Sequence, residues 1–470
     1  MLDTALRALI RAFYFIAFAC LLKWIRALWK RPFPANAPKL VSGYPVVGAL
    51  QFFFDQNGFC QKARDASATG NYSYYLGGDR VVGLSGPEGR KTFFGNRNLD
   101  LDRGSALLIP FANVIESPDD PSIDTHSSHL RFALRTRLLR TQNLEIIPTA
   151  METCISAALK CIGDKSLIDP FEEMKLLYTQ STMAVVGVDE VAVSLNLSKK
   201  VGNLISTMEG TFSAIDMTVP WPLNPLHIPA GIAMGRLCVI MLRIIHDQKR
   251  QQQQQPDKRD PGKENMLQDM IQMGWSTRAI LKILVSSAFA SQGNTPTVAS
   301  WILMGLATDA QWMARGRQEV DQVILKHRKN GESADEVLRS LHVNTWEKEF
   351  PLLHACFLET VRRVVMLVLT RQNISGVDVA IGDTGEVIPP GAYATYNTCE
   401  VTWDSDICPD PQRWDPGRFL SDRTEYLKEA LAYTGFGSGR RKCREGDPPP
   451  RVIDMLTWNL HHLCLKPAEG

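Results

Sequence analysis

A glycine-rich, basic loop near the C-terminus presents a single cysteine, Cys443. The stretch 436–451 reads FGSGRRKCREGDPPPR. Glycine lets a backbone approach another group closely. Neighbouring cations lower the pKa of a thiol and so favour the thiolate, the form that binds metals. A flat hydrophobic cofactor with an acidic edge would also use an aromatic ring and an arginine, which Phe436 and Arg441 supply. The alternative is an ordinary basic loop that contains a cysteine by chance.

A charged pair lies upstream of this loop, in the segment FLETVRR. Glu359 and Arg362 are spaced i, i+3, so a helix would place them on one face, where they can pair. Such pairs are usually solvated surface contacts of little energetic value. Here the pair is followed by DPQRWDPGRF at 410–419 and then by the cysteine loop. This order favours one shared site over an isolated surface contact.

The periodicity of apolar residues predicts a mainly α-helical chain with small β-sheets. Helices are expected at residues 126–140, 146–162, 173–186, 201–214, 232–249, 266–273, 276–307, 310–329 and 349–365. Strands are expected at 72–75, 81–84, 377–381 and 386–388. Within 276–307, Pro296 lacks an N–H and crowds the carbonyl of Gln292, so a kink is expected there. Asn294 can donate and accept hydrogen bonds at this kink.

The composition gives no sign of nucleic-acid binding or of a disulfide framework. The formal charge is +2 over 470 residues, so no strong basic field is implied. The ten cysteines are scattered without paired spacing, as in a protein with reduced thiols. Residues 249–265, KRQQQQQPDKRDPGKEN, are of low complexity and predict a flexible surface loop. The apolar, proline-rich segment 216–231 fits buried packing, membrane contact or a substrate entrance equally well.

The N-terminus predicts a membrane anchor at residues 1–31. Its uninterrupted apolar run, 12–22, is too short to cross a bilayer unaided, since about 20 residues are needed. Basic residues after the run outnumber those before it, which predicts that the rest of the chain faces the cytosol. A cleaved signal peptide and a shallow interfacial helix are the alternatives. A proline-rich linker at 32–48 leads into a globular domain at 49–470.

The cysteine loop resembles the haem-ligand signature of the cytochrome P450 family, F-x-x-G-x-R-x-C, in Phe436, Gly439, Arg441 and Cys443. By this resemblance the cofactor is haem b, iron protoporphyrin IX, and the Cys443 thiolate is the axial ligand of its iron. The implied fold is the P450 fold: a large helical domain with small β-sheets and an N-terminal membrane anchor helix. The likeness extends over almost the whole chain.

The upstream pair resembles the E-x-x-R motif of the same family. Residues 416–419, PGRF, resemble its P-E-R-F segment with the glutamate lost. The resemblance implies that Arg418 completes a structural network with Glu359 and Arg362. That network would support the core on the haem side.

The segment 290–296, ASQGNTP, indicates which branch of the family the chain resembles. Most family members carry an acid and a threonine where Gly293 and Asn294 stand. The branch that contains sterol 7α-hydroxylases and prostacyclin synthase also places asparagine there. By this resemblance Asn294 and Thr295 are catalytic and order the protons of water or peroxide.

The same branch places an arginine nine residues after the arginine of E-x-x-R, where this chain has Arg371. The resemblance therefore assigns Arg371 and Arg441 to the haem propionates. Arg131, with His126 and His129 on the same expected helix, is a weaker candidate for this role.

The resemblance implies a monooxygenase that oxidises an apolar small molecule, such as a terpenoid, steroid or polyketide, with O2. Electrons would come from NADPH-cytochrome P450 reductase, because the chain carries no flavin or nicotinamide fingerprint. The protein would sit in the endoplasmic reticulum membrane with its catalytic domain in the cytosol. Two alternatives stay open. One is a P450-type isomerase that rearranges a peroxide without reductase; the other is a truncated or degenerate haem-binding paralogue without activity.

The residues after Cys443 depart from the family pattern. Glu445 stands where the family has glycine, and an anion near a thiolate opposes its ionisation. Pro448, Pro449 and Pro450 prevent a regular helix until about Arg451. Only 27 residues follow Cys443, fewer than in the family. A truncated or mis-spliced 3′ end, or a degenerate paralogue, is therefore expected.

Overall fold

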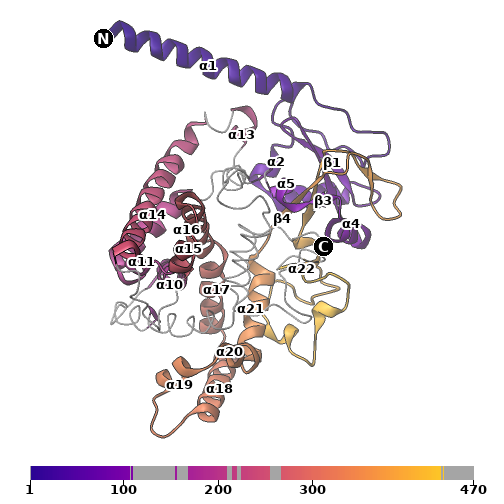
Figure 1. Cartoon of the computed structure of the whole chain (residues 1–470). Helices are drawn as coiled ribbons and strands as arrows, with labels where there is room; N and C mark the ends of the chain where they lie inside the picture. The colour runs from indigo at the N-terminus through magenta and orange to yellow at the C-terminus, as the bar shows by residue number, and fades with distance from the viewer. Residues whose placement is uncertain are drawn as a thin grey trace.

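A computed structural model describes residues 2–105, 107–108, 154–155, 168–208, 214–219, 224–254, 266–435 and 438. Helices gather on one side of the molecule and a β-rich part forms the other (Figure 1). Helix α1 extends away from both (Figure 1). The expectation of a mainly α-helical fold with small sheets is confirmed.

The longer helices are α1 (Leu2–Leu28), α3 (Gln56–Asp65), α4 (Gly86–Gly95), α10 (Pro170–Val185), α12 (Leu195–Met208), α14 (Ile228–Gln254), α16 (Thr277–Gln292), α17 (Asn294–Thr308), α18 (Ala310–His327) and α21 (Pro351–Val364). The shorter ones are α2 (Gln51–Phe54), α5 (Leu101–Ser105), α11 (Asp189–Val193), α13 (Ile215–Thr218), α15 (Met266–Gln272), α19 (Ala334–Ser340), α20 (Val343–Lys348) and α22 (Cys399–Thr402). The 3₁₀ helices in the part of the chain that the structure describes are η3 (Pro225–His227), η4 (Pro416–Phe419) and η5 (Glu425–Leu427).

A five-stranded sheet forms the centre of the β-rich part, in the order β1-β2-β7-β4-β3. Its strands are β1 (Tyr72–Leu76), β2 (Asp79–Leu84), β3 (Leu99–Asp100), β4 (Val368–Asn373) and β7 (Tyr393–Asn397). Only the β2–β7 pair is parallel. A second sheet pairs β5 (Val379–Ala380) with β6 (Val387–Ile388).

Strands β3, β4 and β7 were not expected from the sequence. Strand β4, VLTRQN, buries the polar side chains of Thr370, Arg371 and Asn373. Buried polar residues break the alternation of apolar and polar positions by which a half-buried strand is detected. Thr370 and Asn373 find hydrogen-bond acceptors elsewhere in the tertiary structure. Thr370 Oγ1, for example, donates to the carbonyl of Gly104 at 2.9 Å.

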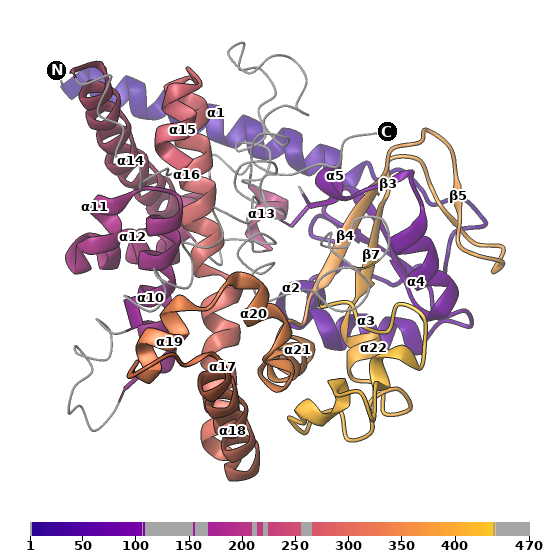
Figure 2. The same ribbon diagram turned by 60° about the horizontal axis from the view of Figure 1, so that its bottom comes forward.

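The long helix expected at 276–307 is interrupted in the structure. Helix α16 ends at Gln292 and α17 begins at Asn294, with Gly293 between them at φ −73° and ψ −87°. The break thus lies three residues before Pro296, which takes up the first turn of α17, where a missing N–H costs nothing. Figure 2 shows α16 leading into α17 and then α18.

The low-complexity segment 249–265 is helical in its first part, which corrects the expectation of a loop from residue 249. Helix α14 continues through Gln254, because glutamine is a good helix former and extends an existing helix at little cost. Residues 255–265 lie outside the described residues.

Helix α14 belongs to the main helical core. Its buried residues Leu237, Met241 and Ile245 pack in one cluster with side chains of α10, α12 and α16. Together with η3 it is long and apolar enough, by length and composition, to cross a membrane. One third of this apolar stretch, 33%, is buried inside the protein.

Burial inside the fold creates an acid-sensitive group in α21. The ring of His354 is packed 6.2 Å from the ring of Phe357, and burial lowers the pKa of His354 from 6.5 to about 4. The unfolded chain therefore binds more protons than the folded chain between these two values. Stability must fall as the pH falls through this window.

We expect replacement of His354 by glutamine to flatten this dependence. The wild-type free energy of unfolding should lose on the order of 3 kcal/mol more than that of His354→Gln between pH 7 and pH 4. Urea unfolding at several pH values measures this difference. His246→Gln, at an exposed position of α14, is the control and should keep the wild-type slope. Parallel pH profiles for wild type and His354→Gln would contradict the prediction.

Candidate functional site

Helix α21 carries the pair Glu359 and Arg362 into the interior. Arg362 Nε donates to Glu359 Oε2 at 2.7 Å, and Arg362 Nη2 to Glu359 Oε1 at 2.8 Å. The side chains are 2% and 0% exposed, so the pair is not a solvated surface contact. Arg362 also donates to the carbonyls of Thr402 and Pro411. Burial opposes the charge of Arg362, but its bonds to Glu359 outweigh this and raise its pKa.

The structure brings Arg418 to the same carboxylate. Arg418 lies in η4, whose first turn is capped by the Asp415 carboxylate accepting from Gly417 N at 3.0 Å. Arg418 Nε is 3.5 Å from Glu359 Oε1, and Arg418 Nη2 donates to the carbonyl of Asp410 at 2.7 Å. Glu359, Arg362 and Arg418 thus form one buried network that ties α21 to residues 402–418.

Sequence reasoning missed the outer members of this network. Glu425 Oε2 accepts from Arg418 Nη1 at 2.9 Å, and Arg423 Nη1 donates to Asp415 Oδ2 at 2.6 Å. Burial alone would raise the pKa of Asp415, but Arg423 holds it below its usual range. No motif in the sequence predicts these contacts. Acidic and basic residues at the same positions would be equally common in a solvent-exposed loop.

The chain that enters the cysteine loop is packed against α21. Tyr433 donates from its hydroxyl to the carbonyl of Leu358 at 3.3 Å, and Ser438 Oγ donates to the carbonyl of Tyr433 at 3.1 Å. A Cβ on Gly435 would lie 2.4 Å from Val361 Cγ1, so only glycine allows this approach. Four expected site residues, Phe436, Gly439, Arg441 and Cys443, lie outside the described residues.

Arg371 is buried on β4. Its guanidinium lies 4.9 Å from the ring centre of Phe93 and 5.7 Å from that of Phe94, and Nη1 is 3.5 Å from the carbonyl of Phe94. An arginine keeps its charge even when buried, so Arg371 brings a positive charge into this part of the interior.

Two hydroxyls near the start of α17 donate back along the helix, each to the carbonyl four residues earlier. Thr297 Oγ1 donates to the carbonyl of Gly293 at 3.0 Å, and Ser300 Oγ donates to the carbonyl of Pro296 at 2.8 Å. Thr295 lies buried in this first turn of α17. Asn294 begins the helix, but its side chain lies outside the described residues, as do Arg131, His126 and His129.

Helices α17 and α21 meet beside the entrance of the cysteine loop. Val298 of α17 packs against Phe357, Leu358 and Val361 of α21, with Tyr433 at the edge of this cluster. Thr295 therefore lies one turn of helix from the contact that holds the loop entrance. Several described residues suit a haem: a buried arginine on β4 for its acidic edge, the buried Thr295 of α17 and the tightly held loop entrance beside α21.

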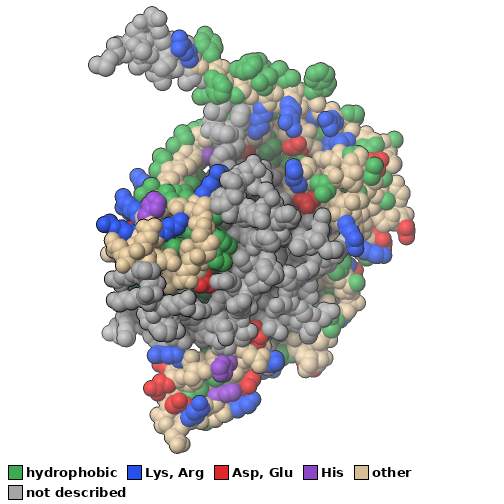
Figure 3. Space-filling model, viewed as in Figure 1, with side chains coloured by type: hydrophobic (Ala, Val, Ile, Leu, Met, Phe, Trp, Pro, Cys, Tyr) green, Lys and Arg blue, Asp and Glu red, His purple; other side chains and the backbone are tan. Residues whose placement is uncertain are grey.

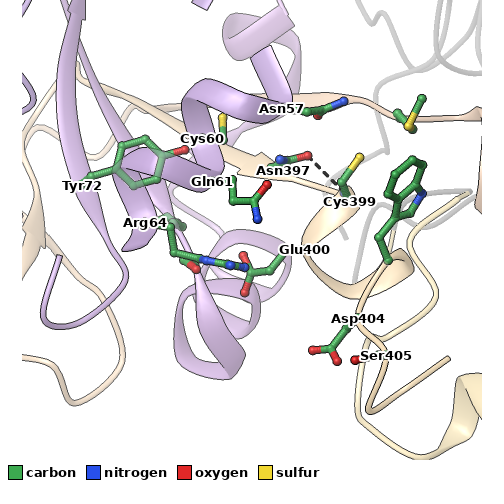
Figure 4. A pocket seen from close by; sticks show the side chains of 14 residues that line it. Asn57, Cys60, Gln61, Arg64, Tyr72, Asn397, Cys399, Glu400, Asp404 and Ser405 are labelled. Atoms are coloured by element: carbon green, nitrogen blue, oxygen red, sulfur yellow. Dashed lines mark hydrogen bonds between the residues drawn. The ribbon is translucent and has the colours of Figure 1, made fainter. Parts of the chain in front are cut away.

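A separate cavity of about 600 Å³ opens between α3, β2 and α22 (Figure 4). Cys60 and Cys399 line it, together with Arg64 and Glu400. Burial raises the pKa of Cys60 to about 12 and that of Cys399 to about 11, so both remain unreactive thiols at neutral pH. Within the described residues no cluster of three histidine, cysteine or acidic side chains could hold a metal ion.

Comparisons with known sequences match cytochrome P450 proteins. The sequence model of the family described as Cytochrome P450 matches residues 38–444. The chain is 27% identical over 435 residues to the cytochrome P450 monooxygenase AacuE of Aspergillus aculeatus, which covers 91% of this chain and 85% of that protein. It is 26% identical over 412 residues to the cytochrome P450 monooxygenase nsrP of Aspergillus novofumigatus, covering 85% and 77%.

A solved structure shares the fold. The retinoic acid-bound cyanobacterial CYP120A1 matches with a TM-score of 0.66 and 19% sequence identity, over 91% of each chain. At this identity the likeness concerns the fold alone.

Removing the carboxylate at the centre of the network should destabilise the protein strongly. Glu359→Gln leaves two buried guanidinium groups without their shared anion, and we expect a loss of about 3–5 kcal/mol in unfolding free energy. Denaturant unfolding measures this loss. The matched control is Glu172→Gln, which removes a surface pair of the same i, i+3 spacing with Lys175, in which Glu172 is 67% exposed. The control should change stability by less than about 0.5 kcal/mol; equal effects would refute a central role for Glu359.

Proposed function

The chain belongs to the cytochrome P450 family, and we propose that it hydroxylates or otherwise oxidises an apolar small molecule with O2 and electrons from a reductase. It is an oxidoreductase of the haem-thiolate type, with iron protoporphyrin IX as its cofactor. The observation that carries the proposal is the cysteine signature of residues 436–443, whose entrance is packed against the buried Glu359 network.

We assign the haem contacts as follows. The Cys443 thiolate would bind the iron, and Arg441 and the buried Arg371 would bind the propionates. Phe436 and Gly439 would belong to the same haem-binding loop. Arg131 is a further candidate for a propionate. The position of Arg371 supports this assignment, because its guanidinium is buried on β4 beside the rings of Phe93 and Phe94.

When bound, the haem supplies activation of O2 for insertion of one oxygen atom into a C–H bond. The protein holds this group, excludes water and orients the substrate. Thr295 is buried beside the helix break, so its hydroxyl can pass a proton without opening the site to bulk water. We place Asn294 in the same proton-ordering role. A terpenoid, steroid or polyketide has the apolar character that such a water-excluding site favours.

A peroxide isomerase is the second candidate function. The observation that favours it is Gly293-Asn294, which stands where most family members carry an acid and a threonine. Such an enzyme would rearrange a peroxide substrate without reductase. The two functions differ in their need for electrons.

A test of whether cytochrome P450 reductase can reduce the haem distinguishes the monooxygenase from the isomerase. We expect NADPH and cytochrome P450 reductase to generate a CO complex with a thiolate-type Soret band in the full-length protein. Cys443→Ser should abolish this band, whereas Cys238→Ser, on half-buried Cys238 of α14, should keep it. If the band forms with dithionite but never with reductase, and a peroxide substrate turns over without electrons, the isomerase is favoured. Absence of the thiolate band with haem bound would refute Cys443 as the ligand.

We further propose that α1 attaches the protein to the endoplasmic reticulum membrane, with the catalytic domain in the cytosol. Apolar side chains are exposed along α1, and basic ones gather where it meets the body (Figure 3). The end of α1 is tied to the loop after α13, since Lys23 Nζ donates to the carbonyl of Val219 at 2.9 Å. Trp24 Nε1 donates to the carbonyl of Thr218 at 2.8 Å.

The proline-rich segment beside α13 is suited to the same surface. Its Asp216 carboxylate is buried and accepts from Asn224 Nδ2 at 2.9 Å, which holds the segment in place. Leu226 and Ile228 are nevertheless exposed. We propose that these apolar side chains contact the membrane together with α1, so that an apolar substrate can enter from the bilayer.

The anchor predicts a change in membrane partition. Phe13, Phe15 and Phe18 on α1 are 69%, 65% and 59% exposed, and replacing all three by glutamine should move most of the protein from the membrane to the soluble fraction. The control replaces Ile374, Val377 and Leu427, which are 55%, 61% and 65% exposed on the body. Vesicle flotation measures the partition. Equal partition of both triple variants would contradict an anchoring role for α1.

A further inference from the structure

The buried network is balanced in charge only if Glu425 is included. Arg362 and Arg418 bring two positive charges into the interior, while Glu359 brings one negative charge. Glu425 is 5% exposed and pairs with Arg418. Because a buried charge without a partner is costly, a second carboxylate is required at this point.

We propose that Glu425 is a positioning residue that holds the segment leading into the cysteine loop. This inference rests on the proposed role of Cys443 as the haem ligand. It assigns a role to a residue that no local sequence motif contains.

Both oxygens of Glu425 are used. Oε2 accepts from Arg418 Nη1 at 2.9 Å, and Oε1 accepts from Arg423 Nε at 3.0 Å. Arg423 in turn pairs with Asp415, and Asp415 N donates to Glu359 Oε1 at 3.0 Å. The contacts close a ring that runs from Glu359 through Asp415, Arg423, Glu425 and Arg418 back to Glu359. Such a ring fixes the loop around η4 and η5 from both ends.

The backbone at Thr424, just before Glu425, is strained, and this conformation allows Glu425 to reach its arginine partners. Thr424 has φ +42° and ψ +43°, in the left-handed region that a threonine rarely adopts. Its conformation turns the chain so that Glu425 enters the interior. A non-glycine residue keeps such a conformation only where the surroundings enforce it, and the paired carboxylate at 425 provides that enforcement.

Because residue 417 is a glycine, the carboxylate of the P-E-R-F glutamate is missing here, and other residues must supply the negative charge. Gly417 stands where the P-E-R-F segment carries its glutamate. A Cβ at this position would lie 3.0 Å from Asp415 Oδ1 and 3.1 Å from Arg423 Nη1. The space beside Gly417 is therefore filled by Asp415 and by Arg423, the arginine that Glu425 also binds. Glu425 and Asp415 together supply negative charge to this part of the network.

The neighbour of Glu425 connects the ring to the cysteine loop. Tyr426 stacks on Phe419, with ring centres 5.3 Å apart and planes at 22°, and lies 6.4 Å from the ring of Tyr433. The carbonyl of Tyr433 accepts from Ser438, five residues before Cys443. A displaced Glu425 would move Tyr426 and so loosen the residues that lead to the thiolate.

The test compares Glu425→Gln with a variant of equal stability loss in a remote part of the core. Glu425→Gln keeps the shape but removes the charge, and we expect the folded-to-unfolded ratio to drop about 100-fold. Leu237→Ala, in the core around α14, is the matched control because it leaves a cavity far from the ring. Glu425→Asp keeps the charge and should restore part of the loss.

The deciding readout is the reduced CO spectrum of the full-length haem proteins, recorded at a temperature where circular dichroism shows each to be folded. Glu425→Gln should lose the thiolate-type Soret band several-fold, Leu237→Ala should retain it, and Glu425→Asp should lie between. Equal spectra for Glu425→Gln and Leu237→Ala would overturn the positioning role. If Glu425→Gln fails to fold, Glu425→Asp decides: a fully retained band then overturns the role and a reduced band supports it. A wild-type protein without the band would instead refute the proposed function itself.

Discussion

The buried carboxylate of Glu359 is the interaction on which the rest of the site depends. It accepts two hydrogen bonds from Arg362, one from the backbone of Asp415, and lies 3.5 Å from Arg418 Nε. Charges are taken out of water at a high cost, so every partner must be held accurately. The arginines donate further N–H groups to carbonyls of Thr402, the last residue of α22, and of residues 409–411, which fixes the irregular segment that follows α22.

On the side of the site formed by α17, polar groups are also held by hydrogen bonds, but the partners there are neutral. At the start of α17 the hydroxyls of Thr297 and Ser300 donate to the carbonyls of Gly293 and Pro296, each four residues earlier in the chain. Both sides are joined where Val298 packs against α21. This packing fixes the position of the helix break relative to the charged network, and the entrance of the cysteine loop lies beside the contact.

Much of the family assignment was available from the sequence. The cysteine signature and the pair Glu359–Arg362 depend on short spacings, and membership in the P450 family and the mainly α-helical fold are confirmed. The branch with sterol 7α-hydroxylases stays a prediction. Strands β4 and β7 were missed because their buried polar side chains hide the alternation. The partners of Glu425 were missed because the same charged residues would be unremarkable in a solvated loop.

The sequence by itself predicted the local chemistry: a cysteine loop at residues 436–443, a helix that carries Glu359 and Arg362, and a disturbance of the long helix near Pro296. Periodicity and spacing act within a few residues, and a sequence displays them directly. Only the tertiary structure decided which charges are buried and how they are balanced. The break falls at Gly293, Arg371 enters the interior, and Glu425 meets Arg418 because segments distant in sequence exclude water from one another. Burial is a property of the packed whole, and it turns ordinary ion pairs into the constraints that shape the site.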